Sequence, residues 1–294
     1  MAKPKKIPAP NQAAAQPVQV EKPGLKWKVI AQIAGAFVIL WVTALMTTPY
    51  ISYWGVGVVA VLTAVAAGFG IYIWRLTKKT SAIAQILQGA TDADGRKAAL
   101  EKLASGDSSD ALNALATAQI QAQEDPNKAI ETLVAIDVEK APVTVQDEIR
   151  AMLALLYLAV NKPKDARPVA DKIRLDRQGN AKAKAMAAAV IAETFARTGK
   201  PDEARVLLET YKSDDPTLAE LRPALLRAQV WTYFALTKRG LARKAMDGLV
   251  ALDPNHVGPF MDPKASPDLQ KIALASLEAG GYQARPKTKM RLSR

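Results

Sequence analysis

A long stretch without charged side chains is the feature that most constrains this chain. Residues 29–74 contain no Lys, Arg, Asp, Glu or His. As one helix, this stretch would be roughly 69 Å long, about twice the ~30 Å thickness of the hydrocarbon core of a bilayer. Pro49 lies near its middle and disfavours a continuous helix. The sequence therefore predicts a transmembrane hairpin at 27–79, with spans at about 29–48 and 51–74.

The charges that flank this stretch predict its orientation. Six lysines precede the first predicted span, and Arg75, Lys78 and Lys79 follow the second, whereas the turn is uncharged. Since Lys and Arg favour the cytoplasmic side of a membrane, we expect an integral membrane protein with both termini in the cytoplasm. A bacterial inner membrane is the simplest location. A secretory signal is the main alternative for the first span, but a second span follows at once.

The positive charge of the chain is concentrated outside the predicted folded domain. The chain of 294 residues has a net charge of +12, but residues 80–284 carry 26 basic and 27 acidic side chains. The excess lies before the hairpin, directly after it and in the C-terminal tail. We therefore expect the lipid bilayer and its anionic headgroups as partners, because such headgroups attract basic segments. Nucleic acid is the less favoured partner.

The composition also divides the chain and excludes some chemistry. Residues 1–26 are rich in Pro, Ala, Gln and Lys and predict a disordered tail. The absence of cysteine excludes disulfides, thiolate nucleophiles and Cys-ligated metals. About 200 residues follow the hairpin, which is enough for one substantial core or for a repeat array.

Beyond residue 80 the pattern is helical and repeats itself. Four segments can be aligned on a small residue, at spacings of 37, 38 and 38: Ala129, Ala166, Ala204 and Ala242. Each segment follows a longer apolar helix, predicted at 110–123, 144–160, 181–197 and 217–237. One such helix pair cannot bury its apolar face alone, so neighbouring pairs must stack. The sequence predicts an all-α solenoid of helix pairs.

The third unit resembles the tetratricopeptide repeat (TPR) family most clearly. The small, aromatic, glycine, alanine, large-apolar and proline positions of that family are filled by Ala192, Phe195, Gly199, Ala204, Leu208 and Pro216. The second unit has Asn161 in place of the glycine, and the units are longer than the usual 34 residues of the family. The resemblance covers residues 108–254 and implies a TPR-like solenoid that binds a protein partner in its concave groove.

The remaining segments are predicted to flank the repeats. Residues 80–107 contain a linker and a capping helix at 95–104. Residues 255–282 contain a proline-rich loop, in which we expect no regular structure because of its prolines, and a terminal capping helix at 268–279. Residues 283–294 form a basic tail. A cap at each end would complete the array, since a solenoid needs polar ends.

The search for a catalytic site is negative. His256 is the only histidine, and we interpret it as a solvated loop residue. No metal-binding, nucleotide-binding or nucleophile motif is present. Carboxylate pairs lie at predicted helix starts, where acids interact favourably with the helix dipole. We therefore predict no enzyme activity, no cofactor and no metal site.

The predicted repeat register places a set of side chains on the inner surface of the array. We predict this concave groove as the partner-binding site: Gln121, Glu148, Glu193, Arg197, Arg227, Trp231 and Phe234. The aromatic cluster at residues 231–234 has two interpretations. It packs against the next helix pair or the terminal cap, or it is an exposed anchor for a partner, since Trp, Tyr and Arg are enriched at binding hot spots.

Together these features predict a membrane-anchored helical-repeat protein. It would mediate protein–protein interaction at the cytoplasmic face as a scaffold or assembly factor, with a partner that the sequence does not identify. The alternative is an accessory subunit of a membrane complex in which the transmembrane hairpin is the functional part.

Overall fold

A computed structural model of the chain describes residues 5–6, 27–51, 54–90, 92–105 and 110–283. These residues are helical apart from two short strands, β1 (Lys5–Lys6) and β2 (Tyr282–Gln283), which pair in parallel. The predicted all-α fold class is confirmed at this level. The chain divides into two compact units, one formed by residues 14–102 and the other by residues 1–13 and 103–294.

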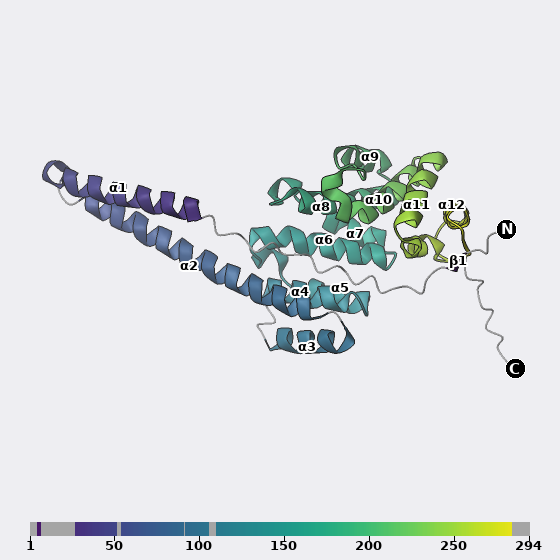
Figure 1. Cartoon of the computed structure of the whole chain (residues 1–294), viewed down its shortest axis with the longest axis horizontal. Helices are drawn as coiled ribbons and strands as arrows, with labels where there is room; N and C mark the ends of the chain where they lie inside the picture. The colour runs from purple at the N-terminus through teal and green to yellow at the C-terminus, as the bar shows by residue number, and fades with distance from the viewer. Residues whose placement is uncertain (1–4, 7–26, 52–53, 91, 106–109, 284–294) are drawn as a thin grey trace. The chain divides into compact units, whose positions relative to one another are not determined.

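The first unit contains a helical hairpin. Helix α1 (Trp27–Ile51) packs along helix α2 (Trp54–Gly89) (Figure 1). The indole Nε1 of Trp41 donates a hydrogen bond to Thr63 Oγ1 at 3.2 Å, which links the two helices. Large apolar side chains of both helices are exposed, among them Ile39. Helix α3 (Ala93–Ala104) follows the hairpin.

The predicted localisation requires a correction. In the part of the chain that the structure describes, no helix has both the length and the apolar character needed to cross a membrane. The prediction of a two-span integral protein of the bacterial inner membrane, with both termini in the cytoplasm, is therefore wrong. It relied on the absence of charge in residues 29–74, and a stretch without charge is not the same as a helix that is apolar throughout.

Details of the hairpin illustrate the difference. The stretch contains polar side chains such as Thr43, whose Oγ1 donates to Ile39 O at 2.8 Å. Helix α1 also continues through Pro49, and α2 continues as one helix beyond the basic residues at 75–79 to Gly89. The boundaries of the helices therefore do not coincide with those of the predicted spans.

The second unit is built mainly from helix pairs that follow one another along the chain. In the described residues the pairs are α4 (Ala111–Gln121) with α5 (Pro126–Val134), α6 (Val143–Ala159) with α7 (Pro163–Ala170), α8 (Ala181–Arg197) with α9 (Pro201–Thr210), and α10 (Arg222–Ala235) with α11 (Arg239–Leu252). The first helices of successive pairs contact each other, so the pairs stack in sequence order (Figure 1). This is a helical-repeat architecture.

Short 3₁₀ segments join the pairs. They are η1 (Val138–Lys140), η2 (Leu175–Arg177) and η3 (Pro216–Leu221). Their ends are formed by local chemistry: for example, Asp215 Oδ1 accepts a hydrogen bond from the backbone N–H of Thr217 at 2.8 Å. An acidic side chain at this position satisfies a donor that has no partner within the helix.

The aligned alanines lie where the helices of each pair approach most closely. Each belongs to the second helix of its pair and is completely buried: Ala129, Ala166, Ala204 and Ala242. A methyl group fills little space, so it allows two helix backbones to come close without a void between them. The predicted 38-residue period therefore has a structural counterpart in the core.

The turns within the pairs repeat with the same period. The backbone is left-handed at Asn161 (φ 59°), Gly199 (φ 88°) and Thr237 (φ 60°), which are 38 residues apart. In each turn the next residue, a lysine, donates its backbone N–H to the carbonyl oxygen five residues earlier, at 2.8, 2.9 and 2.8 Å. This closes the end of the first helix as in a Schellman motif. Pro163 and Pro201 then begin two of the second helices.

The proline-rich segment after the last pair is regular, contrary to expectation. Residues Pro254–Met261 form a 3₁₀ helix, η4, which begins where Asp253 Oδ1 accepts a hydrogen bond from the N–H of Asn255 at 2.8 Å. The prediction of no regular structure here was wrong because the φ of proline suits a 3₁₀ helix. Val257 and Phe260, three residues apart on one side of this helix, are fully buried.

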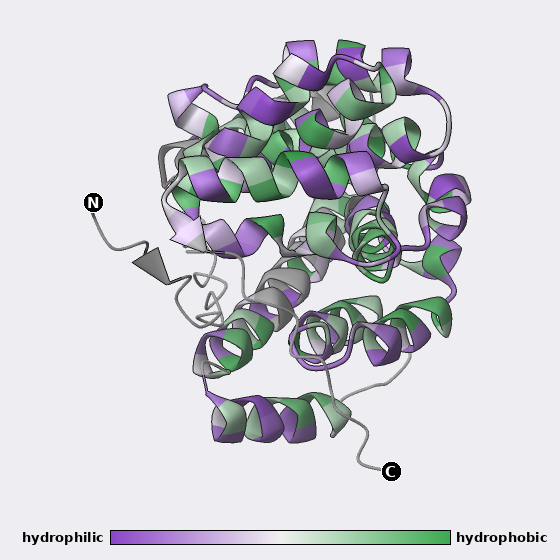
Figure 2. Ribbon diagram, turned by 90° about the vertical axis from the view of Figure 1, so that its right-hand side faces the viewer, coloured by the Kyte–Doolittle hydropathy of each residue, from purple (hydrophilic) through white to green (hydrophobic). Residues whose placement is uncertain are grey.

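The terminal helix α12 (Pro267–Ala279) completes the core at this end. Its buried apolar residues join those of α10, α11 and η4 in one cluster: Leu226, Val230, Met246, Leu249, Val257, Phe260, Leu269, Ala273 and Leu277. Along the helices of this unit, hydrophobic and hydrophilic residues alternate, as Figure 2 shows. Such amphipathic helices bury one face and expose the other.

The left-handed turns generate a stability prediction. Thr237→Gly should raise the free energy of unfolding by about 1 kcal/mol, because a left-handed conformation costs a side chain with a Cβ roughly that much. Gly199→Ala should lower it by a similar amount for the same reason. Urea denaturation of the full chain measures both changes.

Gly179→Ala is the matched control for these variants. Gly179 lies outside the left-handed region, and an added Cβ there meets no atom within 4 Å. This substitution should leave stability unchanged or raise it slightly, since alanine restricts the unfolded chain. If Gly199→Ala and Gly179→Ala have equal effects, backbone strain does not determine these turns.

Candidate functional site

One buried carboxylate joins two successive helix pairs. Glu193, on α8, accepts hydrogen bonds from Arg197 Nη1 to its Oε1 (3.0 Å) and from Arg227 Nε, on α10, to its Oε2 (2.7 Å). The Glu193 side chain is 3% exposed, that of Arg197 8% and that of Arg227 25%. Charged groups removed from water in this way are stable only when they are paired and hydrogen-bonded.

Arg197 extends this network to the preceding pair. Its Nη1 also donates to the carbonyl oxygen of Leu158 at 3.2 Å, and its Nη2 donates to Asn161 Oδ1. Its guanidinium lies 4.4 Å from the ring centroid of Trp231. Burial lowers the pKa of Arg197, and the neighbouring Arg227 acts in the same direction, whereas Glu193 opposes the change. Arg197 thus contacts residues of three helix pairs.

The two aromatic side chains of α10 are held in place. Trp231 packs against the buried Phe260 of η4, with ring centroids 5.4 Å apart. The guanidinium of Arg239 lies 3.9 Å from the ring centroid of Phe234. Both aromatic side chains are half-buried. Trp231 therefore packs against the terminal segment, as one of the two interpretations from the sequence held, but it also keeps part of its surface exposed.

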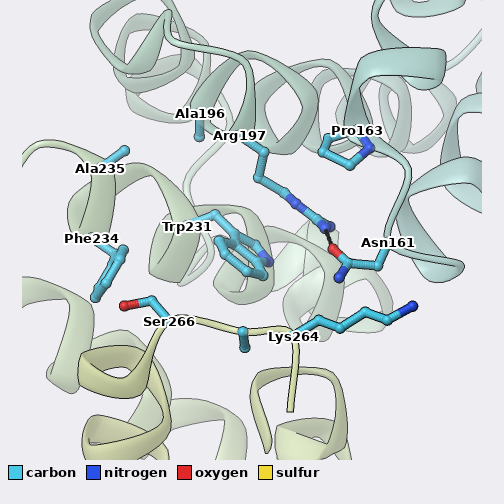
Figure 3. A pocket seen from close by; sticks show the side chains of 10 residues that line it. Asn161, Pro163, Ala196, Arg197, Trp231, Phe234, Ala235, Lys264 and Ser266 are labelled. Carbon is cyan, nitrogen blue, oxygen red and sulfur yellow. Dashed lines mark hydrogen bonds between the residues drawn. The ribbon is translucent and has the colours of Figure 1, made fainter. Parts of the chain in front are cut away.

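The exposed parts of these side chains line a cavity. It has a volume of about 330 Å³ and lies where α8 and α10 end, beside the turn that precedes α7 and the segment before α12. Figure 3 shows Arg197 and Trp231 facing this space, with Lys264 and Ser266 on the opposite side. The lining residues are Asn161, Pro163, Ala196, Arg197, Trp231, Phe234, Ala235, Lys264, Ala265 and Ser266.

The lining of this cavity is cationic and aromatic. Arg197 and Lys264 contribute positive charge, and none of the lining residues is acidic. Among the described residues, Lys264 forms no ion pair, although its backbone N–H donates to Asp262 Oδ1 at 2.7 Å. Below we call these ten lining residues and the Glu193–Arg227 ion pair the Arg197 site.

The structure brings together five of the seven residues predicted for the groove. Glu193, Arg197, Arg227, Trp231 and Phe234 belong to the Arg197 site through the contacts above. This grouping follows from the 34-residue separation between Glu193 and Arg227, close to one repeat. It is the geometry of one cluster at the end of the array.

The other two predicted residues lie elsewhere. Gln121 ends α4, and its Oε1 accepts a hydrogen bond from Thr132 Oγ1 of α5 at 2.7 Å. Glu148 lies on α6 at the surface, and desolvation by the surrounding protein raises its pKa above the ordinary value of 4.5. Among the described residues, neither forms a hydrogen bond or ion pair with the Arg197 site.

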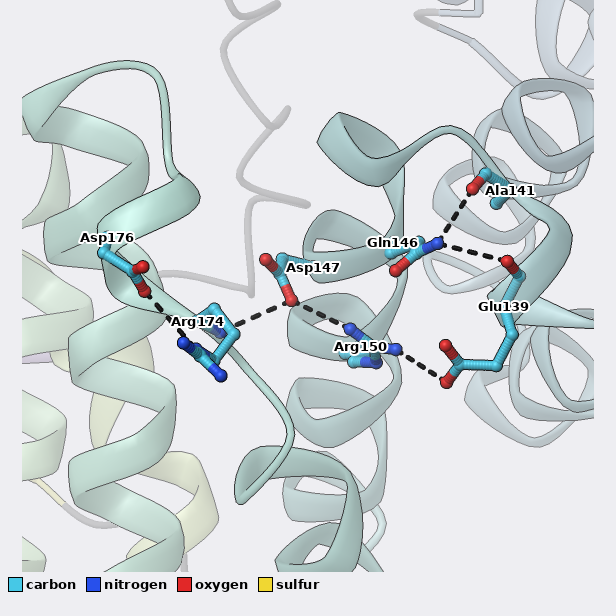
Figure 4. Close-up of polar contacts among 7 residues, drawn as sticks. All are labelled: Glu139, Ala141, Gln146, Asp147, Arg150, Arg174 and Asp176. Carbon is cyan, nitrogen blue, oxygen red and sulfur yellow. Dashed lines mark hydrogen bonds and ion pairs between the residues drawn. The ribbon is translucent and has the colours of Figure 1, made fainter.

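A second buried charge cluster lies on α6 (Figure 4). Asp147 Oδ1 accepts a hydrogen bond from Arg150 Nη1 at 3.0 Å and from the backbone N–H of Arg174 at 3.4 Å. Arg150 Nη2 also donates to Glu139 Oε1 of η1 at 2.8 Å. The buried Asp147 Oδ2 has no hydrogen-bond partner in the described part of the chain. The cluster fixes the segments before and after this helix pair.

A second cavity, of about 300 Å³, lies beside the first helices of three pairs and η4. Its walls are mainly apolar and include Leu155 and Met186, with Arg227 and His256 as polar members. His256 is half-buried there, so the interpretation of this residue as a solvated loop histidine was too simple. The η4 segment holds it against the helix pairs.

Several residues of the Arg197 site were missed by sequence reasoning. Asn161 gave a usable signal, because it occupies the position of Gly199 one repeat earlier and so predicts the same left-handed turn. Phe260 gave a weaker one, since its spacing from Val257 suits a 3₁₀ helix. Lys264 and Ser266 gave none, because the fold of the segment after η4 places them at the cavity.

Comparison with known proteins adds no family assignment. No protein-family model matches the chain, and no curated protein matches it significantly.

The shared carboxylate predicts an asymmetry between two substitutions. Glu193→Gln should lower the free energy of unfolding by about 3 kcal/mol, because two largely buried guanidiniums would lose their only common counter-charge. Arg197→Met should cost less, about 1–2 kcal/mol, because Glu193 keeps Arg227 as its partner. Urea denaturation of the full chain compares the two variants.

Arg205→Met is the control for this comparison. Arg205 pairs with Glu209 on α9 at 2.8 Å, and both side chains are more than a third exposed. Removing an exposed pair should change stability by less than about 0.5 kcal/mol. Equal losses for Glu193→Gln and Arg197→Met would show that the carboxylate is not shared as described.

Proposed function

We propose that this chain is a helical-repeat protein that binds another protein at the Arg197 site. The observation that carries the proposal is the preorganised surface at the end of α8 and α10, where Trp231 and Arg197 are fixed by ion pairs and ring contacts but remain partly exposed. Aromatic and arginine side chains are enriched among the residues that dominate binding energy. Side chains held in place before binding lose little conformational entropy when a partner arrives.

The repeat architecture supports this proposal. We infer that the helix pairs are related in design to tetratricopeptide repeats, on the basis of the buried alanines and left-handed turns that recur at intervals of 38 residues. Stacked helix pairs form extended surfaces that suit the recognition of peptides and helices. In this interpretation the chain acts as a scaffold or assembly factor.

The proposal assigns binding rather than catalysis to the site. Glu193 is the carboxylate within the cluster, and both of its oxygens accept hydrogen bonds from guanidiniums. A general base needs a free oxygen within reach of the proton that it removes. Glu193 therefore contributes to the position of the arginines and not to a reaction.

Site-specific photocrosslinking in cells that produce the protein naturally tests the proposal. A photoreactive phenylalanine analogue at Ala235, which is exposed and lines the cavity, should yield a discrete adduct with a partner protein. The same adduct should be lost from a protein that also carries Trp231→Ala, since the partner would lose a main contact surface. Immunoblotting of the full chain measures the adduct.

Lys271 is the control position. It lies on α12 and is exposed, but it does not line the cavity. The analogue at position 271 should give no adduct of the same size. If positions 235 and 271 give the same adducts, or if position 235 gives none, the Arg197 site is not the site of partner binding. Circular dichroism of each variant shows whether it is folded.

A further inference from the structure

The charges around the Arg197 site do not balance. Glu193 contributes one negative charge to two arginines, and the other acceptors of Arg197, Leu158 O and Asn161 Oδ1, are neutral. The cluster therefore carries an excess of one positive charge, although the Arg197 and Glu193 side chains are largely removed from water. A charge in such surroundings interacts more strongly with a nearby opposite charge than it would in water.

Lys264 adds a second cation on the opposite side of the cavity. Its side chain is exposed and, in the described part of the chain, takes part in no ion pair. Ser266 lies beside it, and its hydroxyl makes no capping bond at the start of α12. The cavity thus offers an ammonium group and a hydroxyl group on one side and the Arg197 cluster on the other.

The remaining wall is apolar. The rings of Trp231 and Phe234 contribute most of it, together with Pro163 and the alanines of the lining. A volume of about 330 Å³ is at the lower end of the range for ligand pockets. It suits one or two amino-acid side chains better than a folded surface.

We propose that the cavity receives an acidic segment of the partner protein, with a carboxylate between Lys264 and the Arg197 cluster and an apolar side chain against Trp231 and Phe234. This inference rests on the proposed function and specifies the chemistry of the partner. The excess positive charge and the absence of acidic residues from the lining carry the choice of a carboxylate. Complementary charge of this kind sets specificity and speeds association.

The chain's own termini are unsuitable occupants of this cavity. Residues 1–28 contain six lysines and one glutamate, and residues 285–294 contain five basic residues and no acidic one. Like charge disfavours either segment beside Lys264 and Arg197. A nucleic acid is also less suitable, because residues 80–284 carry nearly equal numbers of basic and acidic side chains and so offer no extended basic track for a phosphate backbone.

Fluorescence anisotropy with the full-length protein tests the proposal. The probe is a fluorescein-labelled Glu-Glu-Leu-Glu-Glu peptide, and the comparison peptide is Gln-Gln-Leu-Gln-Gln with the same label. The acidic peptide should bind at least about tenfold more tightly than the neutral one, and Lys264→Glu should weaken its binding at least about tenfold. Added salt should weaken the acidic peptide selectively, because it screens exposed charges.

Lys271→Glu is the matched control, since it makes the same change of charge at an exposed lysine of α12 outside the cavity. It should change the affinity by less than about twofold. Equal binding of the two peptides, no binding of either, or equal effects of Lys264→Glu and Lys271→Glu would overturn the proposal. So would tighter binding of a labelled oligothymidylate than of the acidic peptide.

These outcomes are separate from the test of the proposed function. A crosslink from position 235 that persists when the acidic peptide fails to bind would leave partner binding in place and overturn the choice of an acidic segment. Loss of the position-specific crosslink would remove the proposed function itself. Thermal unfolding of Lys264→Glu shows whether that variant keeps its fold, as its exposed position predicts.

Discussion

Glu193 is the group on which the end of the helical array depends. It is almost completely buried and holds Arg197 from its own helix and Arg227 from the next pair. Through Arg197, the same network reaches the carbonyl of Leu158 and the ring of Trp231. Buried ion pairs are not in themselves a source of great stability. Here the consequence is positional: side chains from three helix pairs are fixed relative to one another, which gives the cavity its shape.

A second constraint is the 38-residue period of the backbone. Left-handed residues end the first helix of three pairs, and a buried alanine follows at a constant distance. The period therefore determines both how the chain reverses direction and how closely the two helices of each pair approach. Because cations of one unit stack on aromatic rings, as Arg167 does on Phe195 of the following unit at 4.2 Å, the same period also brings charged and aromatic side chains together.

Local patterns explain how much of this fold could be predicted from the sequence. Helix α8 was predicted at its observed bounds, since Asn180 caps its start and Gly199 provides the turn at its end. The residue set at the groove was predicted in part, because a constant period places Glu193 near Arg227. Helical periodicity and turn chemistry are local signals, and they are strong in this part of the chain.

What the sequence did not predict depends on contacts between distant residues or on properties other than pattern. The regular structure of η4 follows from the burial of Val257 and Phe260 against α10–α12, and the sequence shows only its prolines. The position of Lys264 depends on that packing. The membrane prediction was wrong because the absence of charge was taken as a measure of apolar character, and the described helices do not meet the requirement for a span.

The central claim is that Trp231 and Arg197 form a site for an acidic partner segment. The chain contains five tryptophans, four of them in residues 27–74, so ¹⁹F NMR of protein labelled with 5-fluorotryptophan can observe Trp231 directly, with Trp231→Phe as the assignment. Titration with the Glu-Glu-Leu-Glu-Glu peptide should move the Trp231 resonance and leave the other four unchanged. A Trp231 resonance that stays in place in excess peptide, or five resonances that move together, would contradict the account.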